Sequence, residues 1–291
     1  MLKTLLKKQL LELNYGFFYD QKKGKMRSKA SSIAFIALYA LLMIGIAGGM
    51  FGLFCTMVCG SLVEAGMGWL YFTMFGLFAI AMGVFGSVFN TYSGLYLAKD
   101  NDLLLSMPIP VRYLLTVRLA GVYLMGLMFS AVVILPAIVV YLFVAPFSVS
   151  ALLGCIVLLA VISVVCLVLS CILGWAVAKI SLKLKNKSFI TVILSLVFIG
   201  AYYLVYFRAT ELLSSLVENA VVIGGKIKAA AYPLYVLGKT GEGDFGAMAA
   251  VILATAAVAA ITVWVLSRSF IKIATSSGNT EKVKYRAHSV K

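Results

Sequence analysis

Charged residues divide the chain into long apolar runs. These runs cover residues 30–63, 65–98, 119–178, 188–207 and 245–267. An ionised side chain at the bilayer centre costs roughly 2.5–3.5 kcal/mol on insertion scales, so charge-free runs of this length predict transmembrane helices. As one helix the run 119–178 would extend about 90 Å, roughly three times the ~30 Å hydrocarbon thickness, so it must contain two spans. The pattern therefore predicts six spans.

The prolines indicate where the long run turns. Pro146 and the serines of "APFSVS", residues 145–150, predict the turn, whereas Pro136 stands among leucine and valine and predicts a kink inside a span. The predicted spans cover approximately residues 32–54, 69–96, 113–144, 151–178, 189–206 and 245–266.

Two segments outside the spans have apolar residues at helical spacing. In residues 1–13 the leucines share one helical face, which predicts an amphipathic helix in the plane of the membrane interface. Residues 207–244 also repeat apolar positions near helical spacing, and Gly224 with Gly225 is expected to end that helix. We expect an interfacial or re-entrant hairpin in this outer segment, with an ordinary structured loop as the alternative.

Composition and charge add the class of protein and its orientation. The chain is 63% hydrophobic with a mean hydropathy of +1.06, which excludes a soluble enzyme. Of the 25 Lys and Arg residues, 21 fall in the two tails and the loops on the same face, so both termini are expected in the cytoplasm. The net charge of +15 indicates contact with anionic membrane lipids, and no folded basic domain suggests a nucleic-acid partner.

The expected fold class is therefore all-α, a polytopic membrane protein with six transmembrane helices and an amphipathic N-terminal interfacial helix. Residues 1–29 form the interfacial helix and a basic stretch, residues 30–267 the transmembrane domain, and residues 268–291 a basic cytoplasmic tail. We expect a multi-pass protein of the cell membrane, specifically the bacterial inner membrane.

The sequence offers little for catalysis. The single histidine, His288, lies in the polar tail, no pair of acids falls in a predicted span, and the sequence pattern has no metal-ligand cluster or phosphate-binding glycine loop. Cys55 and Cys59 share a helix face and could bind a metal, but packing is the favoured interpretation. We therefore expect no enzyme activity, no metal site and no cofactor in this chain.

Transport coupled to an ion generally needs an ionisable group within the spans, and the charge-free runs offer none. The stretch "GSVFNTYS" supplies neutral polar groups instead, among them Asn90 and Tyr92. These two residues are candidates for a substrate path, and helix–helix hydrogen bonding is the alternative for Asn90.

The loop 99–112, "KDNDLLLSMPIPVR", is the cytoplasmic loop that carries acids, and we call it the coupling segment. Asn101 or Asp102 can cap a short helix that begins at Leu103, and Pro108 with Pro110 would end it before the next span. Such a helix exposes leucines beside charges, which usually marks a partner site. A loop that packs on its own helix ends is the alternative.

At these residues the chain resembles the permease subunits of ABC-2-type ATP-binding cassette exporters. In that family the corresponding connection carries a sequence like the one formed here by Asp102, Leu104, Leu105, Ser106, Pro108 and Ile109. The amphipathic N-terminal helix, the six spans and a Tyr-Pro element between the last two spans, here Tyr232 and Pro233, also agree.

The resemblance implies a function and its partners. The coupling segment would dock into a P-loop ATPase subunit that binds ATP and Mg²⁺, through Asp100, Asp102, Leu104, Leu105, Ser106, Met107, Pro108, Ile109 and Arg112. Tyr232 and Pro233 would lie in an outer gate. A second six-span unit would complete the permease, as a homodimer, a paralogue or the second half of a longer chain.

The expected function is thus an export permease without catalytic residues of its own, for an apolar or amphipathic substrate such as a hydrophobic peptide, drug or lipid. The alternative is a membrane scaffold, sensor or immunity-type protein that does not transport.

Overall fold

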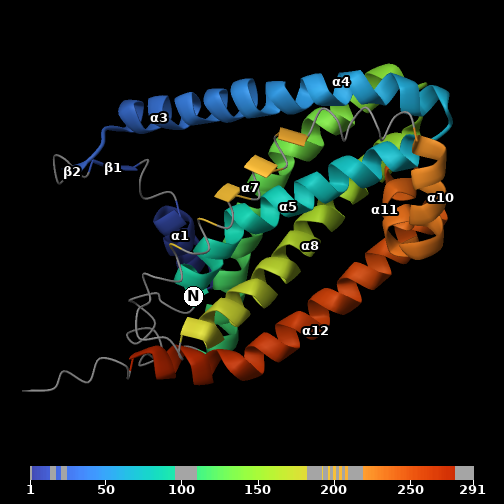
Figure 1. Cartoon of the computed structure of the whole chain (residues 1–291). Helices are drawn as coiled ribbons and strands as arrows, with labels where there is room; N and C mark the ends of the chain where they lie inside the picture. The colour runs from blue at the N-terminus through green and yellow to red at the C-terminus, as the bar shows by residue number, and fades with distance from the viewer. Residues whose placement is uncertain are drawn as a thin grey trace, which may run out of the picture.

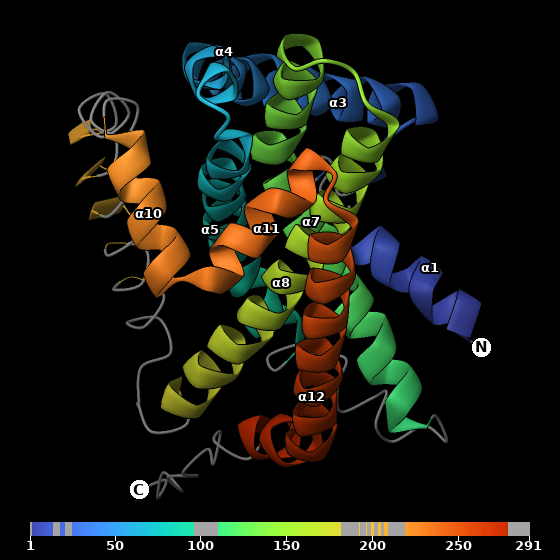
Figure 2. The ribbon, with the colours of Figure 1, turned by 90° about the vertical axis from the view of Figure 1, so that its right-hand side faces the viewer.

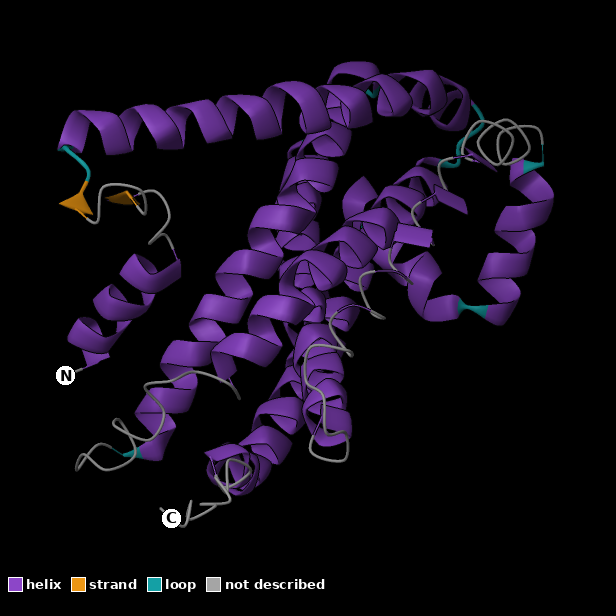
Figure 3. Ribbon diagram, turned by 60° about the vertical axis from the view of Figure 1, so that its left-hand side comes forward, coloured by secondary structure: helices purple, strands orange, loops and turns teal. Residues whose placement is uncertain are grey.

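The computed structural model describes residues 2–13, 18–20, 25–95, 110–181 and 219–278, together with residues 192, 196, 199–200, 203–204 and 207–208. Over these residues the protein is helical, apart from one short antiparallel pair, β1 (Tyr19–Asp20) with β2 (Lys25–Met26). Figure 3 shows how completely the helices dominate the described chain. The all-α expectation is confirmed for this part of the protein.

The first span is one long, nearly continuous helix. It consists of α3 (Lys29–Leu42), the π-helical segment η1 (Met43–Gly48) and α4 (Gly49–Glu64), and together they form an apolar stretch of 36 residues. η1 packs against α7 (Val111–Val144). Figure 1 shows this helix crossing one side of the bundle, and most large side chains of α3 are exposed. Such a surface is suited to lipid contact.

Four further spans form the rest of the bundle. They are α5 (Gly68–Leu95), α7, α8 (Val149–Ser181) and α12 (Phe245–Gly278). The predicted turn at Pro146 is confirmed, because α7 ends at Val144 and α8 begins at Val149. Pro136 lies inside α7, as expected.

In all, five described helices are long and apolar enough to cross a membrane, and the bent pair α10 (Ala220–Ala230) and α11 (Tyr232–Glu242) would make six if counted as one span. They match five of the six predicted spans. Most of the remaining predicted span, residues 189–206, lies outside the described residues. A polytopic helical membrane protein is therefore supported, whereas the count of six and the orientation stay predictions.

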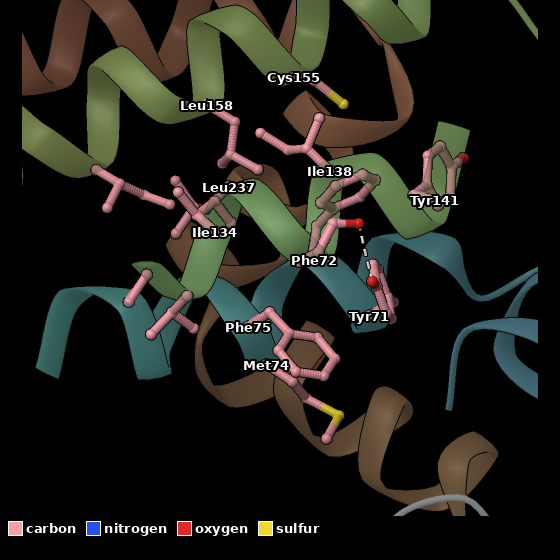
Figure 4. Close-up of a cluster of buried hydrophobic side chains, with 14 of the residues drawn as sticks. Tyr71, Phe72, Met74, Phe75, Ile134, Ile138, Tyr141, Cys155, Leu158 and Leu237 are labelled. Carbon is pink, nitrogen blue, oxygen red and sulfur yellow. Dashed lines mark hydrogen bonds between the residues drawn. The ribbon is translucent and has the colours of Figure 1, made fainter. Parts of the chain in front are cut away.

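The bundle has two hydrophobic cores at its two ends. The larger core joins α4, α5, α7 and α8 with α11, and its fully buried side chains include Tyr71, Phe72 and Ile134. Figure 4 shows them interleaved, with the Tyr71 hydroxyl donating a hydrogen bond of 2.9 Å to the carbonyl oxygen of Ala137. The smaller core gathers Leu95, Leu114, Leu115, Ala178 and Leu266 from the other ends of α5, α7, α8 and α12.

We name the ends of the bundle after the predicted orientation. The inner end holds the smaller core and α1 (Leu2–Leu13), whose Leu5 packs against that core. The outer end holds the larger core and α11. Figure 1 shows α1 and the last turns of α12 toward one end and α10–α11 toward the other, and Figure 2, in which this second end faces the viewer, shows α10 and α11 in front of the bundle.

Candidate functional site

The outer end is built around a helical hairpin. α10 and α11 meet at Ala231 with a bend of 116°, and we call residues 220–242 the outer hairpin. A hairpin was expected here, but the expectation that Gly224 and Gly225 end the first helix is wrong, because α10 continues through both to Ala230. A Cβ at Gly224 would lie 2.6 Å from Met67 Cε. The missing side chain of Gly224 thus allows α10 to pack closely against Met67.

α11 enters the bundle by means of small residues. Gly238 and Gly241 lie directly on α5, where an added Cβ would overlap the Trp69 carbonyl and the Phe72 ring. On the opposite side Gly154 of α8 approaches the Thr240 carbonyl so closely that no side chain would fit. Thr73 Oγ1 donates a hydrogen bond of 3.0 Å to the Leu234 carbonyl. α11 is therefore tightly packed between α5 and α8.

Two carboxylates hold the turn between α11 and α12 at the outer face. Glu242 Oε1 accepts a hydrogen bond of 2.7 Å from the Trp69 backbone N–H, at the N-terminus of α5. Asp244 Oδ1 accepts from the Gly246 and Ala247 N–H groups at 2.9 and 3.2 Å, which caps α12. Gly243, between the two acids, has φ +96°, which favours glycine.

The environments of these acids shift their pKa values in opposite directions. Burial raises the pKa of Glu242, although the Trp69 N–H and Lys239 act against it. The backbone N–H of Ala247 lowers the pKa of the exposed Asp244, and Lys239 Nζ lies 3.7 Å from its Oδ2. Glu242 is thus a half-buried acid whose carboxylate joins the outer hairpin to the second span.

The predicted outer-gate residues lie at the bend of the hairpin. Tyr232 begins α11 and is 61% exposed, and Pro233 occupies the first turn, where its missing N–H costs nothing. The Tyr232 ring lies 5.9 Å from the Tyr235 ring, which meets Trp69 edge to face at 4.8 Å. These residues lie at the same end of the bundle as the larger core, and their role in an outer gate stays a prediction.

A seam of hydroxyl groups runs between α5 and α8. Ser87 Oγ contacts Ser170 Oγ and also bonds to the Gly83 carbonyl at 2.7 Å, and Thr91 Oγ1 donates to the Ser87 carbonyl at 2.8 Å. All three side chains are fully buried. Such bonds to a helix's own carbonyls satisfy the hydroxyl groups without breaking the helix.

The candidate substrate-path residues lie near the inner end of this seam. Asn90 is exposed and lines a cavity of about 220 Å³, whereas Tyr92 is half-buried and packs against the inner core. The structure therefore separates the two: Asn90 faces a cavity, and Tyr92 contributes to helix packing. A substrate path along Asn90 stays a prediction.

Arg118 is the residue of this cavity that the sequence interpretation missed. It is 5% exposed, and its Nη1 donates a hydrogen bond of 3.1 Å to Gln9 Oε1 of α1 and lies 3.7 Å from Glu12 Oε2. The charge count of the sequence placed Arg118 in the loop between the second and third predicted spans. An ionisable residue inside the predicted span 113–144 is itself a signal of a functional site, and that signal could have identified it.

Residues Leu2–Leu13 form the helix α1, where an amphipathic interfacial helix was expected, and part of its surface packs on the bundle. Leu5, Gln9 and Glu12 face the bundle, because Gln9 and Glu12 meet Arg118. Leu10 is 44% exposed. The exposed leucine side is suited to the membrane interface, a location that stays a prediction.

The coupling segment lies mostly outside the described residues. This applies to Asp100, Asp102, Leu104, Leu105, Ser106, Met107, Pro108 and Ile109. Pro110 immediately precedes α7 and Arg112 lies in the first turn of α7, whereas the short helix expected from Leu103 stays a prediction. The segment connects the buried Leu95, the last residue of α5, to α7 at the inner end.

Metal ligation finds no support in the described part of the chain. No group of three or more His, Cys, Asp or Glu side chains is close enough there to hold a metal ion. Cys55 and Cys59 are free and buried in the outer core. Their packing role is thus the better interpretation.

Comparison of the chain with protein-family models, curated proteins and solved structures finds no match in any of the three.

Proposed function

We propose that this protein is the membrane permease subunit of an ATP-driven exporter, in which a separate P-loop ATPase binds and hydrolyses ATP with Mg²⁺. The observation that carries the proposal is the position of α5. Its inner end leads into the coupling segment, and its outer end is joined to α11. Its 28 residues correspond to about 42 Å, so one helix connects the expected docking surface to the outer hairpin.

At the inner end, the coupling segment is anchored on both sides in the same core. Leu95, before it, is fully buried, and Leu114 and Leu115, after it, are 3% and 4% exposed. A close-packed core transmits displacement because it has no free volume to absorb it. A partner that moves the segment therefore moves the inner ends of α5 and α7 together.

At the outer end, α5 contacts the hairpin through groups that leave little room for adjustment. Gly238 lies against the Trp69 carbonyl, and Glu242 accepts the Trp69 N–H. A tilt of α5 would separate these contacts and loosen α11 from the bundle. This would open the outer end while the inner end is engaged by the ATPase.

The buried polar groups of the spans favour an external source of energy. Among the described spans they are Ser32, Thr73, Ser87, Thr91, Ser130, Ser163 and Ser170, with Arg118 as the ionised member near the inner end. A carboxylate that could bind and release a coupling proton is missing from this described set. ATP hydrolysis in a partner meets the need, and a second six-span unit would complete the path.

The experiment is co-purification with the candidate ATPase, compared between the unaltered protein and Asp102→Lys. Reversal of a docking charge should weaken association by about tenfold or more while membrane insertion is unchanged. Glu64→Lys is the matched control: it makes the same charge change at an exposed position at the end of α4 and should leave association intact.

Equal association of both variants with the ATPase would show that the docking site is misplaced. If the purified protein binds no ATPase and ATP does not drive transport in vesicles that contain both proteins, the exporter proposal fails. A scaffold, sensor or immunity-type role then becomes the better interpretation.

A further inference from the structure

The cavity at the inner end, which we call the inner pocket, lies between α1, α5 and α7. Its lining consists of Gln9, Glu12, Asn90, Gly94, Arg118, Gly121, Val122 and Met125, and its volume is about 220 Å³. From its charges and position we infer that the inner pocket binds the headgroup of a zwitterionic phospholipid, a phosphate linked to a primary ammonium group, as in phosphatidylethanolamine. This inference is independent of the export function.

Arg118 supplies the phosphate-binding group. Arg118 is 5% exposed and lines the pocket, where Gln9 and Glu12 of α1 hold its buried guanidinium. Its planar fork of donors matches the oxygens of a phosphate group. The bond of its Nη1 to Gln9 Oε1 fixes the guanidinium against α1.

Glu12 supplies the ammonium-binding group. Its Oε2 lies 3.7 Å from Arg118 Nη1, longer than the roughly 2.7–2.9 Å of a tight charge-assisted hydrogen bond. Its other oxygen lies 3.3 Å from Lys8 Nζ, and its side chain is 41% exposed, so a ligand can reach it. A carboxylate in the wall repels a simple anion, whereas a ligand with both charges can satisfy Arg118 and Glu12 together.

The position of the pocket fits the depth of a headgroup. Asn90 and Gly94 lie within nine residues of Lys99, which ends the uncharged run 65–98, and Arg118 immediately precedes the uncharged run 119–178. The pocket therefore lies where the spans pass from hydrocarbon to the polar interface. Val122 and Met125 extend its wall toward the apolar side and can contact the glycerol and the first acyl carbons.

The test measures lipid binding to the purified full-length protein by native mass spectrometry. The probes are dioleoyl phosphatidylethanolamine, phosphatidylcholine and phosphatidylglycerol, which share their acyl chains. Inorganic phosphate and soluble phosphoethanolamine serve as competitors without acyl chains. We expect phosphatidylethanolamine to bind about tenfold or more tightly than the other two lipids, because phosphatidylcholine has no ammonium N–H donors and phosphatidylglycerol has no cation.

Three variants separate the contributions. Gly94→Leu should block the pocket without disturbing the fold, because an added Cβ there meets no heavy atom within 4 Å, and the same is true of the control Gly225→Leu in α10. Glu12→Gln should remove the preference for phosphatidylethanolamine over phosphatidylglycerol. Arg118→Gln should weaken all three lipids, with Arg268→Gln as the control at an exposed position of the inner end.

The outcomes are decisive in either direction. Selective binding that is lost in Gly94→Leu and retained in Gly225→Leu supports the inference, as does competition by phosphoethanolamine. Equal binding of phosphatidylglycerol and phosphatidylethanolamine, unchanged in Glu12→Gln, would overturn it in favour of a plain anion site. Binding that Gly94→Leu does not reduce would show that the lipid lies elsewhere. None of these readings involves the ATPase, so they leave the proposed function untouched.

Discussion

The packing of α11 against α5 makes a quantitative prediction for Gly238→Ala. A Cβ at this position would lie 2.9 Å from the Trp69 carbonyl carbon and closer still to the Trp69 oxygen and Thr73 Oγ1. Non-bonded carbons prefer separations of about 3.5–4.0 Å, so relief of the first contact alone requires a shift of about 0.6–1 Å. Because two of the three nearest atoms belong to helix backbone, α11 itself must move.

The cost follows from three contributions. Overpacking in a close-packed core costs about 1–3 kcal/mol, and the weakened hydrogen bond from Thr73 Oγ1 to the Leu234 carbonyl adds about 1 kcal/mol. The better helix propensity of alanine offsets about 1 kcal/mol. We expect Gly238→Ala to destabilise the packed position of α11 by about 1–3 kcal/mol.

The native Cys155 reports this change. It is 1% exposed, and its Sγ lies 3.7 Å from the carbonyl oxygen of Gly241 in α11, so a thiol reagent reaches it when the hairpin opens. The labelling rate of Cys155, followed by peptide mass spectrometry, should rise by about fivefold to a hundredfold.

Gly225→Ala is the control for this measurement, because a Cβ there has no neighbour within 4 Å, and it should leave the labelling rate unchanged. An unchanged rate in Gly238→Ala would refute the close contact between α5 and α11.

Three further predictions concern other contacts. Because the pKa of Glu242 is raised in the folded state, its contribution to stability is present at low pH and is lost as the pH rises from 4.5 through the folded-state pKa. Glutamine does not ionise. Thermal unfolding in detergent should therefore show a smaller loss of stability with rising pH for Glu242→Gln than for the unaltered protein. Parallel pH profiles would contradict this. Tyr71→Phe removes the donor to the Ala137 carbonyl and should cost about 0.5–1.5 kcal/mol in the same assay, whereas no loss would indicate that the bond is not formed. A cysteine at Ser215 should react with an impermeant reagent from outside and one at Asn101 should not; the reverse pattern would invert the predicted orientation.

The spans could be predicted from the sequence because burial of charge in hydrocarbon is prohibitive at every position of a span. Lys29 and Glu64 bound the first described span, and the proline-containing segment around Pro146 separates α7 from α8, as expected. These are local features, since the bilayer acts on each helix separately before the helices pack. The positions of α5, α7 and α8 therefore agree closely with the charge pattern, whereas α12 continues past Arg268 to Gly278.

The outer hairpin shows where local signals were insufficient. Two adjacent glycines usually favour the end of a helix, yet Gly224 lies within α10 because its missing side chain makes room for Met67 and Trp69. The hairpin could be expected from the apolar spacing of residues 207–244. Its insertion between α5 and α8 could not, because it depends on backbone approaches between residues such as Trp69 and Gly238, far apart in the sequence.

In the inner pocket, too, the partners of a charged residue could not be predicted from the sequence. The positive charge of Arg118 contributed to the predicted orientation, but only the folded chain brings it against Gln9 and Glu12 of α1. The hydropathy of each segment predicted which residues form long apolar helices, since transfer free energy depends on composition. Which polar groups meet inside the bundle depends on helix register and on close approach at glycines, and these are set by packing between segments distant in the chain.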